Sequence, residues 1–115
     1  MTGRSILRLR VMIAPRGVAP QEVIVEVDDL AVEIRQDNTG FAVGAGAIDA
    51  LFVVERQPRH GFLTWFGVFA RGRGLADRLL LETPEGPVAR FVERAIEDRL
   101  GLADEPVRGE LRVAL

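Results

Sequence analysis

The sequence predicts an α+β domain: about seven antiparallel strands in two packed sheets or a partly open barrel, then one amphipathic helix and a short C-terminal strand. Most segments up to residue 82 alternate between apolar and polar residues, which is the period of half-buried strands. Glycine, proline, aspartate and asparagine separate these segments and indicate turns. Between residues 86 and 100 the apolar spacing changes to three and four residues, which is typical of a helix.

The length and the apolar content favour a single domain over residues 1–115. A domain near 115 residues buries roughly 65% of the surface that its unfolded chain exposes. Because 48% of the residues are apolar, the chain can fill one core. The sequence contains no internal repeat and no segment that resembles a linker between domains.

The alternating pattern of residues 6–45 predicts strands that are joined by turns. Asp28-Asp29 forms either a tight turn or a bend within one long strand, because aspartate side chains bond nearby backbone amides. The later turn at residues 37–40 ends in Gly40, which is free to take a positive φ. The expected strands of the whole chain cover residues 6–13, 22–27, 30–36, 41–45, 47–55, 62–71 and 75–82.

The segment at residues 47–55 is apolar on both faces apart from Asp49, so its periodicity fits a helix or a strand. The run Leu51-Phe52-Val53-Val54 is rich in β-branched and aromatic residues, which favours a strand. A turn signal at residues 57–61 follows directly. We therefore expect a strand that is buried on both sides.

The strand at residues 62–71 is the most informative feature of the chain. Four of the seven aromatic residues lie within its first eight positions, and arginines flank them on both sides. The glycine-rich segment Gly72-Arg73-Gly74 turns the chain into the next strand. One face of the aromatic strand should carry Phe62, Phe66 and Val68, and the other Leu63, Trp65 and Phe69.

The helix is expected from about Gly86 to Leu100. Pro87 suits the first turn of a helix, and Gly101 suits the left-handed residue that ends one. The last segment, residues 107–115, alternates again and should form an edge strand in its own chain or in a neighbouring one. The predicted inward stripe of the helix is Val88, Phe91, Val92, Ala95, Ile96 and Leu100, and the predicted outer residues are Arg90, Glu93, Arg94, Glu97 and Asp98.

The composition makes several kinds of chemistry improbable, so we do not expect an enzyme. The chain has no cysteine, tyrosine or lysine, which removes thiolates, sulfur ligands and Schiff-base chemistry. Ser5 and His60 are the single serine and histidine, and no His-x-x-His or calcium-loop spacing occurs, so no metal and no cofactor are expected.

The N-terminus lacks the uninterrupted apolar region of a secretory signal. Its apolar residues are interleaved with arginines such as Arg4, Arg8 and Arg10. No apolar stretch approaches the roughly 20 residues that span a bilayer. A cytoplasmic location is therefore the expectation.

The aromatic strand gives the leading functional hypothesis, which is protein–protein contact or self-association by a non-catalytic domain. Aromatic residues and arginine contribute most of the binding free energy in protein interfaces. The partner is either another protein or a second copy of the chain. The predicted interface residues are Leu63, Trp65, Phe69, Arg71 and Arg73.

The alternative hypothesis is an anion-binding surface for nucleic acid or a membrane. All fifteen cationic residues are arginine, whose planar guanidinium binds phosphates and carboxylates through two hydrogen bonds. The net charge of −2 gives no global attraction to anions, so the binding would depend on a local basic face. The predicted residues of that face are Arg8, Arg10, Arg56 and Arg59.

Seven expected strands are followed by one helix over roughly residues 5–100. The most characteristic segments are the Val23 to Gln36 strand pair, the strand ending Val53-Val54-Glu55, the Arg71-Gly72-Arg73-Gly74 tip, the run from Leu79 to Gly86, and a helix with Phe91 and Leu100 inward. Together they resemble the pleckstrin-homology-like fold of small bacterial domains. The resemblance implies two packed antiparallel sheets, a helix that closes one open end, and a binding scaffold rather than an enzyme.

Three features depart from that family. The lysine-rich motif that binds phosphoinositides has no counterpart, so lipid headgroup binding is not implied. The tryptophan common in the closing helix is absent, and Phe91 is the nearest substitute. The strand-like tail after Gly101 is an addition.

Overall fold

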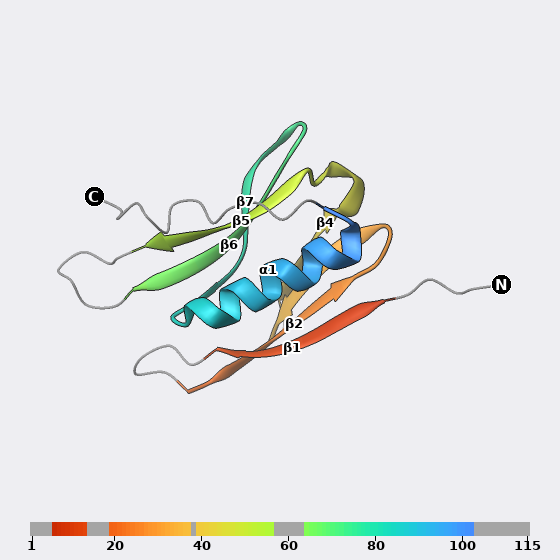
Figure 1. The fold of residues 1–115 in the computed structure, drawn as a ribbon. Helices are drawn as coiled ribbons and strands as arrows, with labels where there is room; N and C mark the ends of the chain where they lie inside the picture. The colour runs from red at the N-terminus through yellow and green to blue at the C-terminus, as the bar shows by residue number, and fades with distance from the viewer. Residues whose placement is uncertain (1–5, 14–18, 38, 57–63, 103–115) are drawn as a thin grey trace.

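Two antiparallel sheets and one helix make up the fold in a computed structural model, which describes residues 6–13, 19–37, 39–56 and 64–102 (Figure 1). The predicted fold class is confirmed, and the predicted strand at residues 107–115 lies outside the described residues. The elements are β1 (Leu7–Ile13), β2 (Gln21–Val27), β3 (Ala31–Gln36), β4 (Thr39–Gly44), the 3-10 helix η1 (Ala45–Ala47), β5 (Ala50–Arg56), β6 (Trp65–Gly72), β7 (Leu75–Thr83) and α1 (Gly86–Leu100).

Both sheets are simple meanders, in the orders β1-β2-β3-β4 and β5-β6-β7. The core lies where their inner faces and α1 meet, because α1 contacts β1 and β2 of one sheet and all three strands of the other. Figure 1 shows the helix lying across the opening between the sheets. Val25, Val32, Val68 and Ile96 are fully buried there.

The segment at residues 47–55 is a strand, as the β-branched run predicted. η1 replaces its first residues, and β5 then pairs with β6 from Ala50 to Arg56. Leu51 and Val53 point into the core. Phe52 points to the opposite face and is also buried, so β5 is buried on both of its faces.

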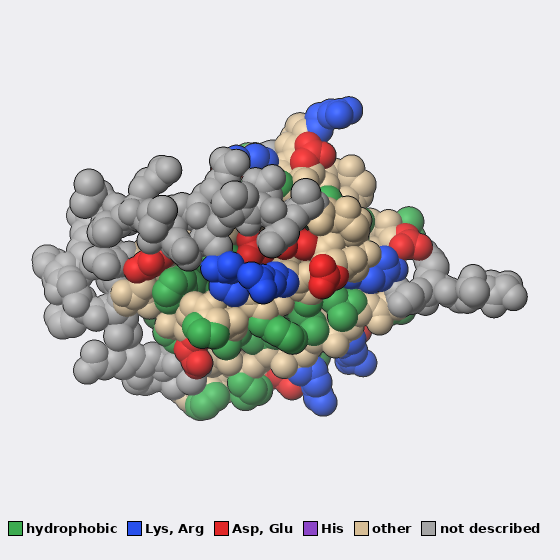
Figure 2. Space-filling model, in the orientation of Figure 1, with side chains coloured by type: hydrophobic (Ala, Val, Ile, Leu, Met, Phe, Trp, Pro, Cys, Tyr) green, Lys and Arg blue, Asp and Glu red, His purple; other side chains and the backbone are tan. Residues whose placement is uncertain are grey.

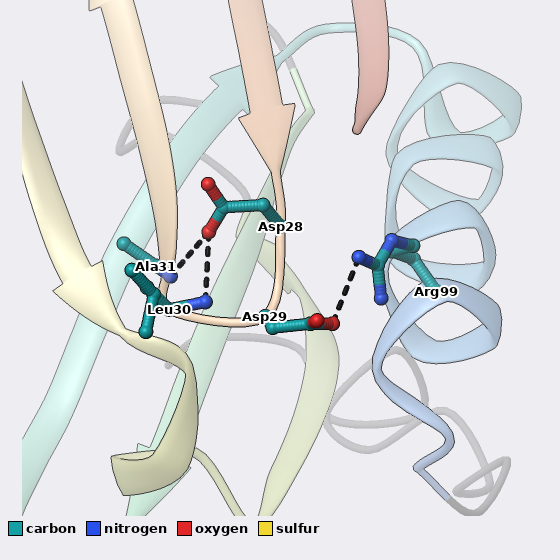
Figure 3. Close-up of polar contacts among 5 residues, drawn as sticks. All are labelled: Asp28, Asp29, Leu30, Ala31 and Arg99. Atoms are coloured by element: carbon teal, nitrogen blue, oxygen red, sulfur yellow. Dashed lines mark hydrogen bonds and ion pairs between the residues drawn. The ribbon is translucent and has the colours of Figure 1, made fainter. Parts of the chain in front are cut away.

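Asp28 forms the tight turn between β2 and β3, so the hairpin is confirmed and the single bent strand is excluded. One carboxylate oxygen of Asp28 accepts hydrogen bonds from the backbone N–H groups of Leu30 and Ala31, at 2.8 and 2.9 Å (Figure 3). Asp29 points the other way and lies 2.9 Å from a guanidinium nitrogen of Arg99 at the end of α1. The turn therefore also connects the four-stranded sheet to the helix.

The turn between β3 and β4 differs from the prediction in one respect. Asp37, rather than Gly40, has the positive φ, at 55°. Gly40 is already paired with Arg35 in the sheet, and a Cβ at position 40 would lie 3.0 Å from the Arg35 side chain. The lack of a side chain at Gly40 therefore allows close strand pairing, and the left-handed residue comes earlier because an aspartate tolerates that conformation.

The ends of α1 are as predicted. Pro87 lies in the first turn, and Gly101 ends the helix with φ 72° and ψ 29°. The N–H of Leu102 donates to the carbonyl of Glu97 at 2.9 Å, which satisfies one of the last carbonyls of the helix.

The buried face of α1 was predicted in part, because Val92 and Ile96 are buried and Val88 and Leu100 pack against the core as expected, whereas three other residues differ from the prediction. Phe91 is 60% exposed, whereas Glu93 and Glu97, expected outside, are 1% and 2% exposed. At the first turn, a Cβ at Gly86 would lie 3.1 Å from the ring of Phe66, so the glycine lets the helix begin close to this ring. The buried residues of α1 are Ala89, Val92, Glu93, Ile96 and Glu97.

Candidate functional site

The three-stranded sheet has an outer face on the side away from the core. Alternate residues of β5 and β6 contribute Leu51, Val53, Val68 and Ala70 to the core, so the residues between them point outward. Cross-strand register places these outward residues opposite one another. We use "outer face" for this set, which consists of Ala50, Phe52, Val54, Arg56, Trp65, Gly67, Phe69, Arg71 and Leu79.

The centre of the outer face is an aromatic stack. Phe52 and Phe69 are direct cross-strand partners, and their rings are 5.4 Å apart and inclined by 11°. The guanidinium of Arg71 lies over the Phe52 ring at 4.7 Å, a cation–π geometry. Phe52 is 7% exposed although it is not part of the main hydrophobic core. The outer face therefore has an apolar layer of its own.

Gly67 makes room for this layer. A Cβ at position 67 would lie 2.9 Å from the Phe69 ring and 3.1 Å from the side chain of Leu79. The Phe69 ring therefore extends back along β6 over Gly67 and contacts the neighbouring strand. The glycine among the aromatic residues has a packing role that its place in the sequence did not reveal.

Ion pairs surround the apolar layer. Arg71 donates two hydrogen bonds to Asp77, at 3.0 and 3.1 Å, in addition to its position over Phe52. These hydrogen bonds and the positive charge of Arg71 hold the pKa of Asp77 below its usual value. At the other end of the sheet, Arg56 lies 3.9 Å from Glu82. The rim therefore carries both signs of charge.

The predicted interface residues lie mostly together. Trp65 and Phe69 are half-buried on the outer face, and Arg71 and Arg73 are exposed near the β6–β7 turn. Leu63 lies outside the described residues. Sequence reasoning missed Phe52 and Leu79, which come from the neighbouring strands. Both residues pair with Phe69 across the sheet, and the sequence alone does not show this pairing. Because the run at residues 51–54 is apolar throughout, its composition does not show which of its residues face outward.

Three of the four arginines predicted to bind anions, Arg8, Arg10 and Arg56, have acidic partners. Nε of Arg8 lies 3.2 Å from Glu26, which also pairs with Arg35 at 3.1 Å, and Nε of Arg10 lies 3.0 Å from Glu22. Figure 2 shows arginine and acidic side chains interspersed on the face that carries α1.

These arginines also belong to different sheets. Arg8 and Arg10 lie on β1, whereas Arg56 lies at the end of β5, in the other sheet. Arg59 lies outside the described residues. The three described arginines of this set therefore come from two different sheets.

A cavity of about 400 Å³ lies between the ends of β1 to β3, the start of β4, and the edge strand β7. Its wall includes residues from both faces of β7, with Leu79 from the outer face and Leu81 from the core face. Trp65 also lines it, at the first position of β6. The cavity and the outer face therefore meet at Trp65 and Leu79.

Within the described residues, no three acidic or histidine side chains come together as a metal site would require. Nor does that part of the chain contain a helix with the length and apolar content to cross a membrane.

A comparison of the sequence with models of known protein families found no match, and a comparison with curated proteins found no significant relative. The resemblance to the pleckstrin-homology-like fold therefore stays a prediction, drawn from the order of strands and helix.

Proposed function

We propose that the chain is a non-catalytic binding domain that acts through protein–protein contact, and that its partner is a second copy of the same chain. The observation that carries the proposal is the Phe52–Phe69 stack on the outer face, with Arg71 above it. Aromatic residues and arginine at the centre of a surface, inside a polar rim, are the usual anatomy of a protein interface. The outer face is the contact surface in this proposal.

The rim supports a second copy as the partner. In a two-fold symmetric dimer the same patch meets itself, so every charge on the rim must find an opposite charge on the same patch. The outer face meets this requirement, because Arg71 and Asp77 lie at one end and Arg56 and Glu82 at the other. A rim of one sign would repel a second copy.

The salt bridges favour this proposal over anion binding. Arg8 and Arg10 already contact Glu26 and Glu22, so a phosphate would have to compete with those carboxylates for the same guanidinium groups. The carboxylates would also repel it.

The test is the solution mass of the full chain, measured by light scattering over a range of protein concentrations. We expect the mass to rise toward that of a dimer, and to change little with salt because an apolar contact is weakly screened. Trp65→Ala and Phe69→Ala should each shift the equilibrium toward monomer. Phe91→Ala is the matched control, since Phe91 is an exposed aromatic residue on α1, away from the outer face.

Trp65 provides a second readout. The chain has one tryptophan and no tyrosine, so its emission reports Trp65 alone. Quenching by iodide should weaken as the protein concentration rises, because the dimer shields the outer face. A monomer at every concentration, with constant quenching, would refute the proposal. So would a dimer that Trp65→Ala and Phe69→Ala leave intact while both variants stay folded by circular dichroism.

A further inference from the structure

The inner rows of the four-stranded sheet change from aliphatic to amide residues at one end. In β2 the inward positions are Val27, Val25, Val23 and then Gln21, and in β3 they are Val32, Ile34 and then Gln36. The two glutamines meet across the sheet, where Nε2 of Gln36 donates a hydrogen bond to Oε1 of Gln21. Two carboxamides therefore stand at positions that the pattern assigns to the core.

These carboxamides line the cavity, and their mutual bond uses only part of their capacity. A glutamine side chain has two N–H donors and an oxygen with two lone pairs. After the bond between them, Gln36 still offers its carboxamide oxygen and Gln21 its NH2 group. The cavity thus contains a donor and an acceptor close to each other.

Most of the remaining described lining residues are apolar, with Thr39 and Glu82 as polar exceptions, so polar and apolar groups contribute about equally to the surface of the cavity. Ile13, Ile34, Phe41 and Trp65 line the cavity together with the leucines of β7, and Phe41 and Trp65 are only partly buried. A bulge in β7, where pairing with β6 skips Leu80, brings both Leu80 and Leu81 to buried positions in this wall. Bulges of this kind often redirect side chains beside binding sites.

The cavity size and charge define what it can hold. A volume of about 400 Å³ is in the range of small-molecule sites, and equals roughly a dozen water molecules at about 30 Å³ each. Among the described residues that line it there is no arginine and one ionisable side chain, Glu82, which lies 3.9 Å from Arg56. Just outside the lining, the guanidinium of Arg78 lies 4.4 Å from the centre of the Phe41 ring. Glu82 in the wall disfavours an anionic ligand, and the neighbouring Arg56 and Arg78 disfavour a cationic one.

We infer that this cavity binds a small, uncharged, largely apolar molecule that carries one amide or an equivalent donor–acceptor pair. The apolar body contacts Phe41, Trp65 and the leucines of β7, and the amide group bonds to Gln21 and Gln36. This site is distinct from the aromatic stack of the outer face, and its occupation does not require a second copy of the chain.

The test uses the full chain and three probes that share a naphthalene ring and differ in the polar group and its charge: naphthalene-2-carboxamide, naphthalene-2-carboxylate and protonated 2-(aminomethyl)naphthalene. Binding is measured by calorimetry and by saturation-transfer NMR. We expect the carboxamide to bind at least about tenfold more tightly than either charged probe, since an unpaired charge must lose its hydration. Gln36→Met keeps the volume and removes the amide, so it should reduce this preference to about twofold or less.

Phe91→Ala is the control, because Phe91 is an exposed aromatic residue on α1 that is not among the lining residues, and it should leave carboxamide binding unchanged. If Gln36→Met lowers the thermal midpoint too far for the measurement, Gln21→Met removes the other amide and replaces it in the test. The inference is wrong if the carboxamide fails to bind at about 1 mM, if a charged probe binds as tightly, or if neither glutamine variant changes the preference. None of these results bears on whether the chain forms a dimer.

Discussion

The carbonyl oxygen of Ala47 occupies the position that a side chain at Gly72 would take. A Cβ at position 72 would lie 1.6 Å from that oxygen, far inside contact distance. The close approach lets the N–H of Asp49 donate to the carbonyl of Arg71 at 2.8 Å, which aligns β5 with β6 before their regular pairing begins. Gly72 therefore sets the start of the three-stranded sheet and, with it, the position of Arg71.

Gly72→Ala should lower the free energy of unfolding by about 2–3 kcal/mol, because the backbone of η1 or of β6 must move. Urea unfolding monitored by circular dichroism measures the change. Gly44→Ala is the matched control: a Cβ there meets nothing within 4 Å, so its effect should stay within about 0.5 kcal/mol. Equal effects of the two substitutions would contradict the close approach.

Asp28 and Asp29 are adjacent and identical in type, but only Asp28 forms the turn. Asp28→Ala removes two hydrogen bonds to backbone N–H groups and should cost about 1–2 kcal/mol. Asp29→Ala removes a surface ion pair to Arg99 and should cost about 0–1 kcal/mol. Parallel urea titrations measure both. A larger loss from Asp29→Ala would show that the contact with the helix, rather than the turn, matters more.

Phe91 and Ile96 test which face of α1 is buried. Ile96→Ala should cost about 2–4 kcal/mol, because it leaves a cavity in the core. Phe91→Ala should change stability by about 0.5 kcal/mol or less, since the ring is 60% exposed. Thermal and urea unfolding of both variants give the comparison. A large loss of stability from Phe91→Ala would instead support the helix face that the sequence predicts, with Phe91 buried.

The ion pair between Arg71 and Asp77 predicts a dependence on pH. Because the pKa of Asp77 is lowered in the folded state, the stabilisation is complete above the usual value of 3.8 and is lost as the pH falls through the lower folded value. Asp77→Asn should therefore be slightly less stable than the natural chain near neutral pH. Below about pH 3.8 the difference should shrink.

Urea unfolding of both proteins at a series of pH values between about 7 and 3 measures this difference. A stability difference that is the same at both ends of the series would contradict the role of the Asp77 carboxylate.

The order and class of the elements could be predicted because they depend on local patterns. Alternation identified the strands, the change of period identified the helix at its observed limits, and Gly101 marked its end. Even the ambiguous segment around Leu51 was resolved by its β-branched residues. Each of these signals acts over a few neighbouring residues and is therefore present in the sequence.

The candidate site was predicted only in part. The aromatic strand indicated Trp65 and Phe69, whereas Phe52 and Leu79 join them through pairing with other strands. The cavity was not predicted, because Gln21 and Gln36 lie fifteen positions apart and resemble ordinary strand-end polar residues in the sequence. Their meeting depends on the register of β2 and β3.

The sequence by itself determined the strands, most of the turns and the helix at residues 86–100, since periodicity and turn chemistry are local. Only the tertiary structure decided the full buried face of α1, where Glu93 and Glu97 are buried and Phe91 is exposed. It also decided which arginines have acidic partners and which residues share the outer face. These relationships depend on packing between segments far apart in the chain, and packing selects among faces that have similar hydrophobicity.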